Sequence, residues 1–289
     1  MVSRSSSRGP RSKAGRKCSL RRTRKIGVCN PAQAALSPEL QHEALTSRIT
    51  QECRDAFVAA LRPPLAEALY KVVRESLDKC EQLFGELELD PPLACKRGCI
   101  SCCYNQVVLS EPEALYLGFH LLETQTPQQL RELHARAGEL VTALEGKTMQ
   151  EIGMERHLHT CLFLQDGTCS VYQARPLVCR GWNSVNADMC RYSNQTGDAL
   201  APIENHALPR LLAESIRTGL LCGANDLGLE AGYMLTVRAV FLLLEAGQGD
   251  LGRGLLEFLD SWLRGESFFS SWRGAGGSKK HVSGVAAKN

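Results

Sequence analysis

The sequence predicts a mainly α-helical protein, in which a helical body holds two cysteine-rich loops. Three observations predict this fold class. Apolar residues recur at helical spacing, most clearly over residues 64–85. Proline follows a Ser or Thr cap at residues 37–38 and 126–127, which is typical of helix starts. A short extended segment, residues 107–109, is expected among the helices.

The expected helices follow one another with clear boundaries. Pro63 and Pro64 separate the first two, and Asp90-Pro91-Pro92 ends the second and opens the first cysteine loop. Ser110 is expected to cap the third helix, and Thr126 the fourth. The helices are predicted over residues 37–61, 64–85, 111–122, 127–144, 206–220, 229–246 and 250–264.

The chain is expected to form a single helical domain, residues 37–270, between two tails. The hydrophobic fraction of 44% and the charged fraction of 22% are ordinary for a globular protein. Residues 1–25 contain ten Lys or Arg and no acid, which leaves 24 basic against 31 acidic residues in the remainder. Residues 1–36 are therefore expected to be a disordered basic tail, and residues 271–289 a flexible C-terminal tail.

Composition excludes several classes of protein. No apolar run approaches the roughly 20 residues that span a bilayer, so no membrane partner is expected. No apolar stretch follows the basic N-terminus, so no export signal is predicted and the expected location is cytoplasmic. Stable disulfides are rare in that reducing compartment. The basic tail has no interleaved aromatic residue, so we do not expect nucleic acid as a partner. A protein partner or substrate stays open.

Eight of the 13 cysteines form two runs, and residues 104–160 between the runs contain none. Thiolates are soft donors, and short spacings let one loop present several sulfurs to one metal ion or iron–sulfur cluster. Zinc and iron–sulfur clusters both accept four thiolates, so spacing does not separate them. The core of this region spans residues 95–192. The predicted metal ligands are Cys95, Cys99, Cys102, Cys103, Cys161, Cys169, Cys179 and Cys190.

The remaining cysteines have different expected environments. Cys53, Cys80 and Cys222 lie in helical patterns and are predicted to be small buried apolar residues. Cys102 and Cys103 are adjacent, so their side chains are expected to diverge. They would then serve two different metal atoms, or one would remain a free thiol.

The second run contains a predicted hairpin and three polar side chains. Asp166-Gly167 is a tight turn that would bring Cys161 and Cys169 together. Three residues beside the sulfurs are candidate cofactor-binding residues: Tyr172, Arg175 and Arg180. They would hydrogen-bond the ligands or hold an anionic substrate, and the alternative is that they only pack the loop through salt bridges. His157 and His159 are expected to be exposed at a helix end, with metal ligation as the alternative.

These motifs together resemble the CxxCxxCC family, also described as the YkgJ-like zinc- or iron-chelating domain. The resemblance rests on the first run, on Cys161 and on Cys169 with Tyr172 and Arg175-Pro176, then on Cys179-Arg180. The first spacing is C-x-x-x-C here rather than C-x-x-C, which is similar to some branches of the family. Residues 181–184, which read GWNS, and Cys190 resemble an extension in one such branch.

The resemblance implies a metal-binding protein that holds zinc or an iron–sulfur cluster, with its cellular role open. One branch is similar to flagellin lysine N-methylases, which implies an alternative: a cluster-dependent protein-lysine N-methyltransferase that uses S-adenosylmethionine. Residues 95–102 also match the C-x-x-x-C-x-x-C spacing of radical S-adenosylmethionine enzymes, but the flanking segments are helical and no β/α alternation follows. No catalytic residue is predicted.

Overall fold

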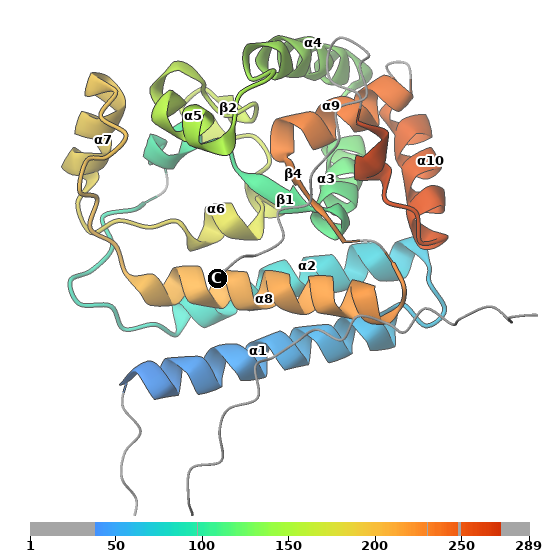
Figure 1. Cartoon of the computed structure of the whole chain (residues 1–289), viewed down its shortest axis with the longest axis horizontal. Helices are drawn as coiled ribbons and strands as arrows, with labels where there is room; N and C mark the ends of the chain where they lie inside the picture. Colours follow the sequence, from blue (N-terminus) through green and yellow to red (C-terminus); the bar gives the residue numbers. More distant parts are fainter. Residues whose placement is uncertain (1–37, 97, 230, 248–249, 273–289) are drawn as a thin grey trace, which may run out of the picture. The chain divides into compact units, whose positions relative to one another are not determined.

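Three long helices lie side by side and form one layer of the structure: α1 (Pro38–Ala60), α2 (Ala66–Gly85) and α8 (Ala207–Asp226) (Figure 1). The computed structural model describes residues 38–96, 98–229, 231–247 and 250–272. In α2 the apolar positions that predicted the helix are buried, among them Leu69, Val73 and Leu77. The helix at α8 extends beyond the predicted end at residue 220, to Asp226.

The α1–α8 contact depends on a glycine. A Cβ at Gly219 of α8 would lie 2.6 Å from the Cβ of Cys53 and 2.6 Å from the carbonyl oxygen of Thr50, both in α1. No side chain fits there without a shift of the α1 backbone. Cys53 is 4% exposed, as predicted for a small buried apolar residue, and Cys80 and Cys222 are also buried.

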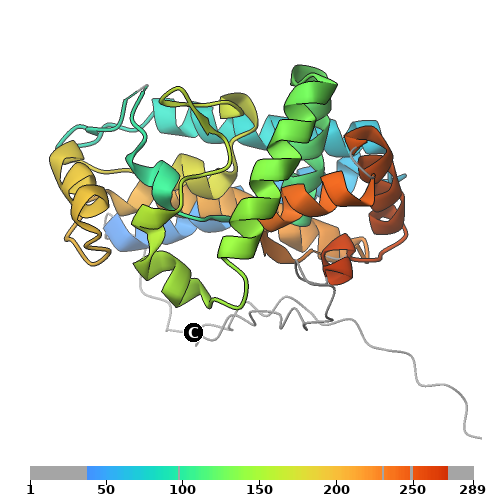
Figure 2. The same ribbon diagram turned by 90° about the horizontal axis from the view of Figure 1, so that it is seen from above.

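A second set of helices contains α3 (Glu111–Thr124), α4 (Pro127–Ala143), α9 (Thr236–Ala246) and α10 (Leu251–Leu263) (Figure 2). Helix α9 contacts the other three, and α3 also packs against α2, which joins the two sets. The predicted caps of α3 and α4 are confirmed, because Ser110 and Thr126 each form a capping box. The short helix η4 (Phe268–Ser271) and Trp272, which is buried, follow α10.

The prediction of a helix over residues 229–246 is wrong in its first part. Strand β4 (Tyr233–Leu235) pairs antiparallel with β1 (Val108–Ser110), and α9 begins only at Thr236. This pairing is non-local, so helical periodicity gave no sign of it. The amide of Gly232 also donates to the buried carboxylate of Glu111 at 3.0 Å and holds the segment extended. The extended segment predicted near residue 108 is confirmed.

The cysteine region consists of short elements rather than the two loops expected. Four of the eight cysteines lie in short helices of this region. Cys102 and Cys103 lie in η1, Cys179 in α6 and Cys190 in α7. The elements are η1 (Ser101–Tyr104), α5 (Met149–Met154), η2 (Arg156–Leu158), β2 (Leu164–Gln165), β3 (Thr168–Cys169), η3 (Tyr172–Ala174), α6 (Leu177–Gly181) and α7 (Ala187–Thr196).

Several expectations concern residues outside the described part of the chain. The basic tail at 1–36, the cap Ser37, Cys18 and Cys29 lie there, as does the expected C-terminal tail beyond residue 272. The packed body reaches two residues into that predicted tail, since Trp272 is buried. Over the described ranges, no helix combines the length and apolar character needed to span a membrane.

Candidate metal centre

Backbone hydrogen bonds bring the two cysteine runs together. The amide of Ala94 donates to the carbonyl of Ser184 at 2.9 Å, and the amide of Ser184 donates to Cys95 Sγ at 3.3 Å. Further along, the amide of Cys161 donates to the carbonyl of Cys103 at 2.6 Å. Segments far apart in the sequence are therefore joined at two points, one at each end of the first run.

The predicted hairpin between Cys161 and Cys169 is confirmed. Strands β2 and β3 pair antiparallel, and Asp166 and Gly167 both have positive φ, 46° and 70°. This is the backbone that Asp-Gly favours in a two-residue hairpin turn. Leu164 is opposite Cys169 in the register. The Cys161 sulfur also accepts hydrogen bonds from the amides of Phe163 and Leu164, so the hairpin is built around it.

A buried carboxylate sets the position of Cys179. Glu113, which is 4% exposed, accepts the amide and hydroxyl of Ser110 at 2.9 and 2.7 Å with Oε2. Its Oε1 accepts the amide of Leu177 at 2.9 Å. One side chain therefore caps α3 and also holds the first residue of α6, in which Cys179 lies. A helix as short as α6 depends on such an outside partner for its first amides.

Helix α7 places Cys190 against the first run. Asn186 caps this helix by accepting the amides of Asp188 and Met189. One turn beyond Cys190, the Asn194 side-chain amide donates to the carbonyl of Ser101 at 2.8 Å. That hydrogen bond ties α7 to η1, so Cys190 comes to lie with the first run rather than with the rest of the second.

The eight thiols form two groups of four, and each group takes members from both runs. We call the first the cavity group: Cys95, Cys99, Cys102 and Cys190. All four line one cavity, and burial followed by the charges of the other three raises the pKa of Cys95. We call the second the inner group: Cys103, Cys161, Cys169 and Cys179. None of these four lines that cavity.

Electrostatic interactions link the inner group to Cys102, because the charge of Cys102 raises the pKa values of Cys161, Cys169 and Cys179. The pKa of Cys103 is raised by its hydrogen bond to Cys102, by burial, and by charges that include those on Cys161 and Cys169. Burial raises the pKa of Cys179 well above its usual range, and the charges of Cys161 and Cys169 add to this. Burial also raises the pKa of Cys161, to about 11.

Cys102 and Cys103 connect the two groups. The prediction that these adjacent side chains diverge is wrong, because the Cys103 thiol donates a hydrogen bond to the Cys102 sulfur. The curled 3₁₀ backbone of η1 allows this contact. That bond, assisted by the positive charge of Arg175, lowers the pKa of Cys102 to about 6 despite burial.

The sulfur donors fit zinc or iron in their chemistry, although they do not lie in a coordination geometry. Thiolate sulfurs are the ligands that zinc and iron–sulfur clusters use, and backbone amides already point at Cys95 and Cys161. Among the residues that the structure describes, no three His, Cys, Asp or Glu side chains form a metal-binding arrangement, and no disulfide joins the described cysteines. A bound cation would favour the thiolate form of its ligands and would draw four sulfurs together around it.

The three polar candidates of the second run have distinct environments. Arg180 is 6% exposed, and its guanidinium donates to the carbonyls of Arg175 and Gln173 and to the carboxylate of Glu81. Arg175 stacks over the exposed ring of Tyr172, 4.8 Å from the centroid. Its charge lowers the thiol pKa values of the nearby cysteines, against the larger effect of burial at Cys169 and Cys179.

The cavity beside the cavity group has a volume of about 450 Å³. Parts of η1, α5, α7 and the segments 181–184 and 199–210 line it. Four large apolar side chains that line it are substantially exposed: Met149 (51%), Met154 (44%), Trp182 (41%) and Leu200 (79%). The sulfurs of this group therefore border a space that is open to small molecules.

Sequence analysis missed two features of the site. Helix α5, a wall of the cavity, was not predicted, although Thr148 and Glu151 carry the S/T-x-x-E signature of a capping box. The contact from Glu113 to α6 had no local signal, because it joins residues 64 positions apart. His157 packs its ring beneath Gly197, and both His157 and His159 are half-buried rather than exposed as predicted. Among the described residues neither belongs to a group of three or more metal-binding side chains.

Comparison with known proteins supports this reading of the cysteines. Residues 94–197 match the model of the CxxCxxCC family, described as a "putative zinc- or iron-chelating domain". This confirms the family resemblance carried by the two runs, and it identifies the class of site as a zinc- or iron-chelating cysteine domain. All eight thiols fall inside the matched residues. No curated protein and no solved structure matched the chain.

Proposed function

We propose that this chain is a metal-binding protein that holds zinc or an iron–sulfur cluster through Cys95, Cys99, Cys102, Cys103, Cys161, Cys169, Cys179 and Cys190. The observation that supports it is the proximity of the two runs: four thiols from both runs line one cavity, and the charge of Cys102 acts on each of the other four thiols. Four thiolates make up a complete tetrahedral zinc site or the ligands of one cluster. When bound, the metal would supply the cross-link between the two runs.

Two arginines are proposed to assist metal binding without being ligands. Arg175 would offset the negative charge that the inner group acquires when its thiols lose their protons, because that charge otherwise opposes burial. Arg180 would hold the segment 172–175 against α2, since its donors are used by backbone carbonyls and Glu81. Tyr172 would keep Arg175 in place through the stacked contact.

Anaerobic purification followed by metal analysis and a visible spectrum tests the proposal. Stoichiometric iron and sulfide with visible absorption would identify a cluster, and a colourless protein with about one or two zinc ions would identify zinc sites. Cys99→Ser and Cys179→Ser should each lower the metal content and the melting temperature. Cys53→Ser, a buried cysteine outside both groups, is the matched control and should keep its metal. Unchanged metal content in both site variants would contradict the proposal.

The cavity favours a second candidate function, a cluster-dependent protein-lysine N-methyltransferase that uses S-adenosylmethionine. Such an enzyme needs a small-molecule pocket next to its cluster, and the cavity group borders a space of about 450 Å³. Transfer of a labelled methyl group from S-adenosylmethionine to protein lysines in a cell extract tests it. No transfer by the metal-loaded chain, in an extract where a known methyltransferase is active, would contradict this candidate function.

A further inference from the structure

A buried cation without an acidic partner lines the cavity beside the cysteines. Arg156 is 9% exposed, and its Nη1 donates to Asn105 Oδ1 at 3.0 Å and its Nη2 to the hydroxyl of Ser193, so both partners are neutral. Its buried Nε has no hydrogen-bond partner, and no carboxylate among the described residues forms an ion pair with this guanidinium. A buried charge without a counter-charge is costly, so the site favours an anion.

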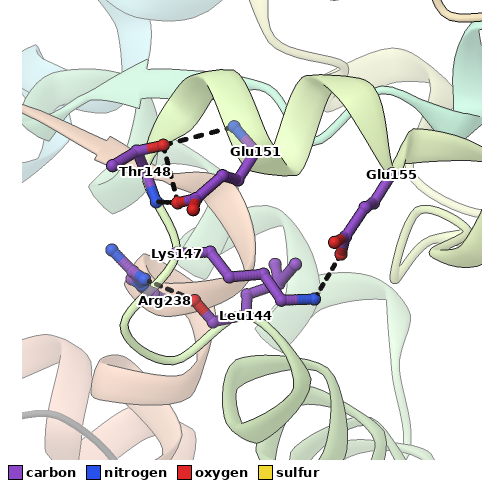
Figure 3. Close-up of polar contacts among 6 residues, drawn as sticks. All are labelled: Leu144, Lys147, Thr148, Glu151, Glu155 and Arg238. Atoms are coloured by element: carbon purple, nitrogen blue, oxygen red, sulfur yellow. Dashed lines mark hydrogen bonds and ion pairs between the residues drawn. The ribbon is translucent and has the colours of Figure 1, made fainter.

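The acid next to Arg156 in the sequence is already paired. Glu155 forms an ion pair with Lys147 at 2.5 Å, as Figure 3 shows. In the same view, Arg238 of α9 donates to the carbonyl of Leu144 at 3.2 Å and holds the segment that leads into α5, a wall of the cavity. The wall is therefore anchored to the rest of the protein, and Glu155 does not balance the charge of Arg156.

The charges around the cavity leave Arg156 available to an anion. Among the described residues that line the cavity, none is Asp or Glu, and the second arginine, Arg210, is exposed. Cys102 also lines it, with a pKa lowered to about 6. The positive charge of Arg175 contributes to that lowering and offsets the Cys102 thiolate. An anion that enters the cavity therefore meets a guanidinium group without competition from an acidic side chain of the lining.

The volume and the apolar lining indicate the kind of anion. A volume of about 450 Å³ falls in the range of roughly 300–1,000 Å³ that is typical of small-molecule pockets. Met149, Met154, Trp182 and Leu200 line the cavity as exposed apolar side chains, so an apolar body would bury surface against them. Arg156 supplies one buried positive charge, which one carboxylate balances. A phosphate monoester carries about −1.5 to −2, so part of its charge would be left without compensation.

We propose that the cavity binds a small organic monocarboxylate, whose carboxylate pairs with Arg156 and whose apolar body lies against Met149, Met154 and Trp182. A guanidinium group has five N–H donors, and the described bonds use one on each Nη, so donors remain for a carboxylate. Arg210, at the exposed edge, attracts the anion toward the opening. This inference rests neither on the proposed metal nor on methyl transfer, because no thiol holds the carboxylate.

Isothermal titration calorimetry of the full-length protein with 4-phenylbutyrate and with 4-phenylbutyramide tests the class of ligand. The two probes have the same apolar body and differ in the charge of the head group. The acid should bind about tenfold more tightly than the amide or better, because only the acid forms a charge-assisted pair with the guanidinium. A third probe, 3-phenylpropyl phosphate, should bind more weakly than the acid. Equal affinity of acid and amide, tighter binding of the phosphate, or no binding of the acid would overturn the proposal.

A substitution at Arg156 tests the ion pair itself. Arg156→Gln should lower the affinity for 4-phenylbutyrate by about tenfold and leave the affinity for the amide unchanged. Arg217→Gln is the matched control, because the Arg217 side chain is 11% exposed and does not line the cavity. Arg156 also joins Asn105 to Ser193 of α7, so a melting curve followed by circular dichroism first establishes that Arg156→Gln is folded.

A cavity-filling variant keeps the proposal testable if Arg156→Gln does not fold. Gly153 lies on the cavity wall in α5, and a Cβ there meets nothing within 4 Å. Gly153→Phe should therefore fold, and the added ring should weaken the binding of both the acid and the amide by about tenfold. Gly85→Phe, at an equally open position at the end of α2, is the matched control and should bind both probes as the wild type does.

The possible outcomes separate this inference from the proposed function, because the metal content of the same samples is measured independently. Protein that contains no metal in any preparation but binds the acid through Arg156 contradicts only the proposed function. Metal-loaded protein that does not bind the acid contradicts only this inference. The same holds if folded Arg156→Gln, or Gly153→Phe, binds 4-phenylbutyrate as tightly as the wild type does.

Discussion

Single buried side chains hold the candidate metal centre in place from a distance. Glu113 is the clearest case, because its two carboxylate oxygens accept hydrogen bonds from both Ser110 and Leu177. The first contact is local and follows from the Ser-x-x-Glu pattern, whereas the second joins α3 to the helix that carries Cys179. A polar group buried to this degree is costly to leave without partners.

Glu113→Gln should destabilise the protein by about 2 kcal/mol or more, because the amide nitrogen of glutamine cannot accept both sets of donors. It should also weaken metal binding, since α6 loses its outside partner. Urea unfolding and metal analysis of the same samples measure the two effects. Glu151→Gln, in the exposed capping box of α5, is the matched control and should cost less. Equal losses in the two variants would show that burial and the contact to α6 do not matter.

Buried thiols outside the two groups predict how stability depends on pH. Cys80 is 0% exposed, and burial raises its pKa from 9.0 to about 12. Because the folded pKa lies above the unfolded one, its contribution is complete below pH 9 and is lost as the pH rises toward 12. The loss approaches about 1.4 kcal/mol per pH unit.

Cys80→Ala should remove this contribution. The difference in free energy of unfolding between wild type and variant should be constant from pH 7 to 8.5 and shrink as the pH rises through roughly 9 to 11. Urea unfolding of metal-free protein in buffers of matched ionic strength measures it. A difference that stays flat up to pH 11 would mean that the Cys80 thiol titrates normally in the folded protein.

At the scale of elements, the α1–α8 contact sets how the first layer packs. Gly219→Ala should destabilise the protein by about 2 kcal/mol, because the new Cβ meets the Thr50 carbonyl and the Cys53 side chain, and backbone atoms cannot move aside alone. Thermal or urea unfolding checks this. Gly85→Ala, where a Cβ has open space, should cause no loss. A neutral Gly219→Ala would imply that α1 can shift outward freely.

The short elements of the metal centre cannot be stable by themselves, because α6 has five residues and β2 and β3 two each. Helices of this length are marginal without tertiary partners. The capping patterns and the Asp-Gly turn predict where such elements start, but their existence depends on contacts with α3, α8 and the first cysteine run. This is why the region was predicted as loops.

At the scale of the whole molecule, we expect the apolar core and the proposed metal centre to be separate sources of stability. The core lies between the long helices and within the set formed by α3, α4, α9 and α10, and it includes Leu115, Leu243 and Trp262, all fully buried. The cysteine region contributes fewer large side chains to it. Metal therefore has most to add where the elements are shortest.

Removal of metal should leave most of the helical circular dichroism signal unchanged and loosen the cysteine region. Hydrogen exchange should show lost protection over residues 95–105 and 161–190, while α8, α9 and α10 keep theirs. Re-addition of metal should restore protection. Uniform loss of protection across the described helices would contradict the separation of core and metal centre.

The sequence by itself determined the helical class, the caps of α3 and α4, the hairpin turn, and the set of eight thiols, because each of these depends on local spacing or on residue chemistry. Only the tertiary structure decided that β4 replaces the start of a predicted helix, that Glu113 supports α6, and that Cys102 and Cys103 share a hydrogen bond while joining different groups. It also decided which four thiols line the cavity. These features depend on contacts between segments tens of residues apart, which no local pattern records.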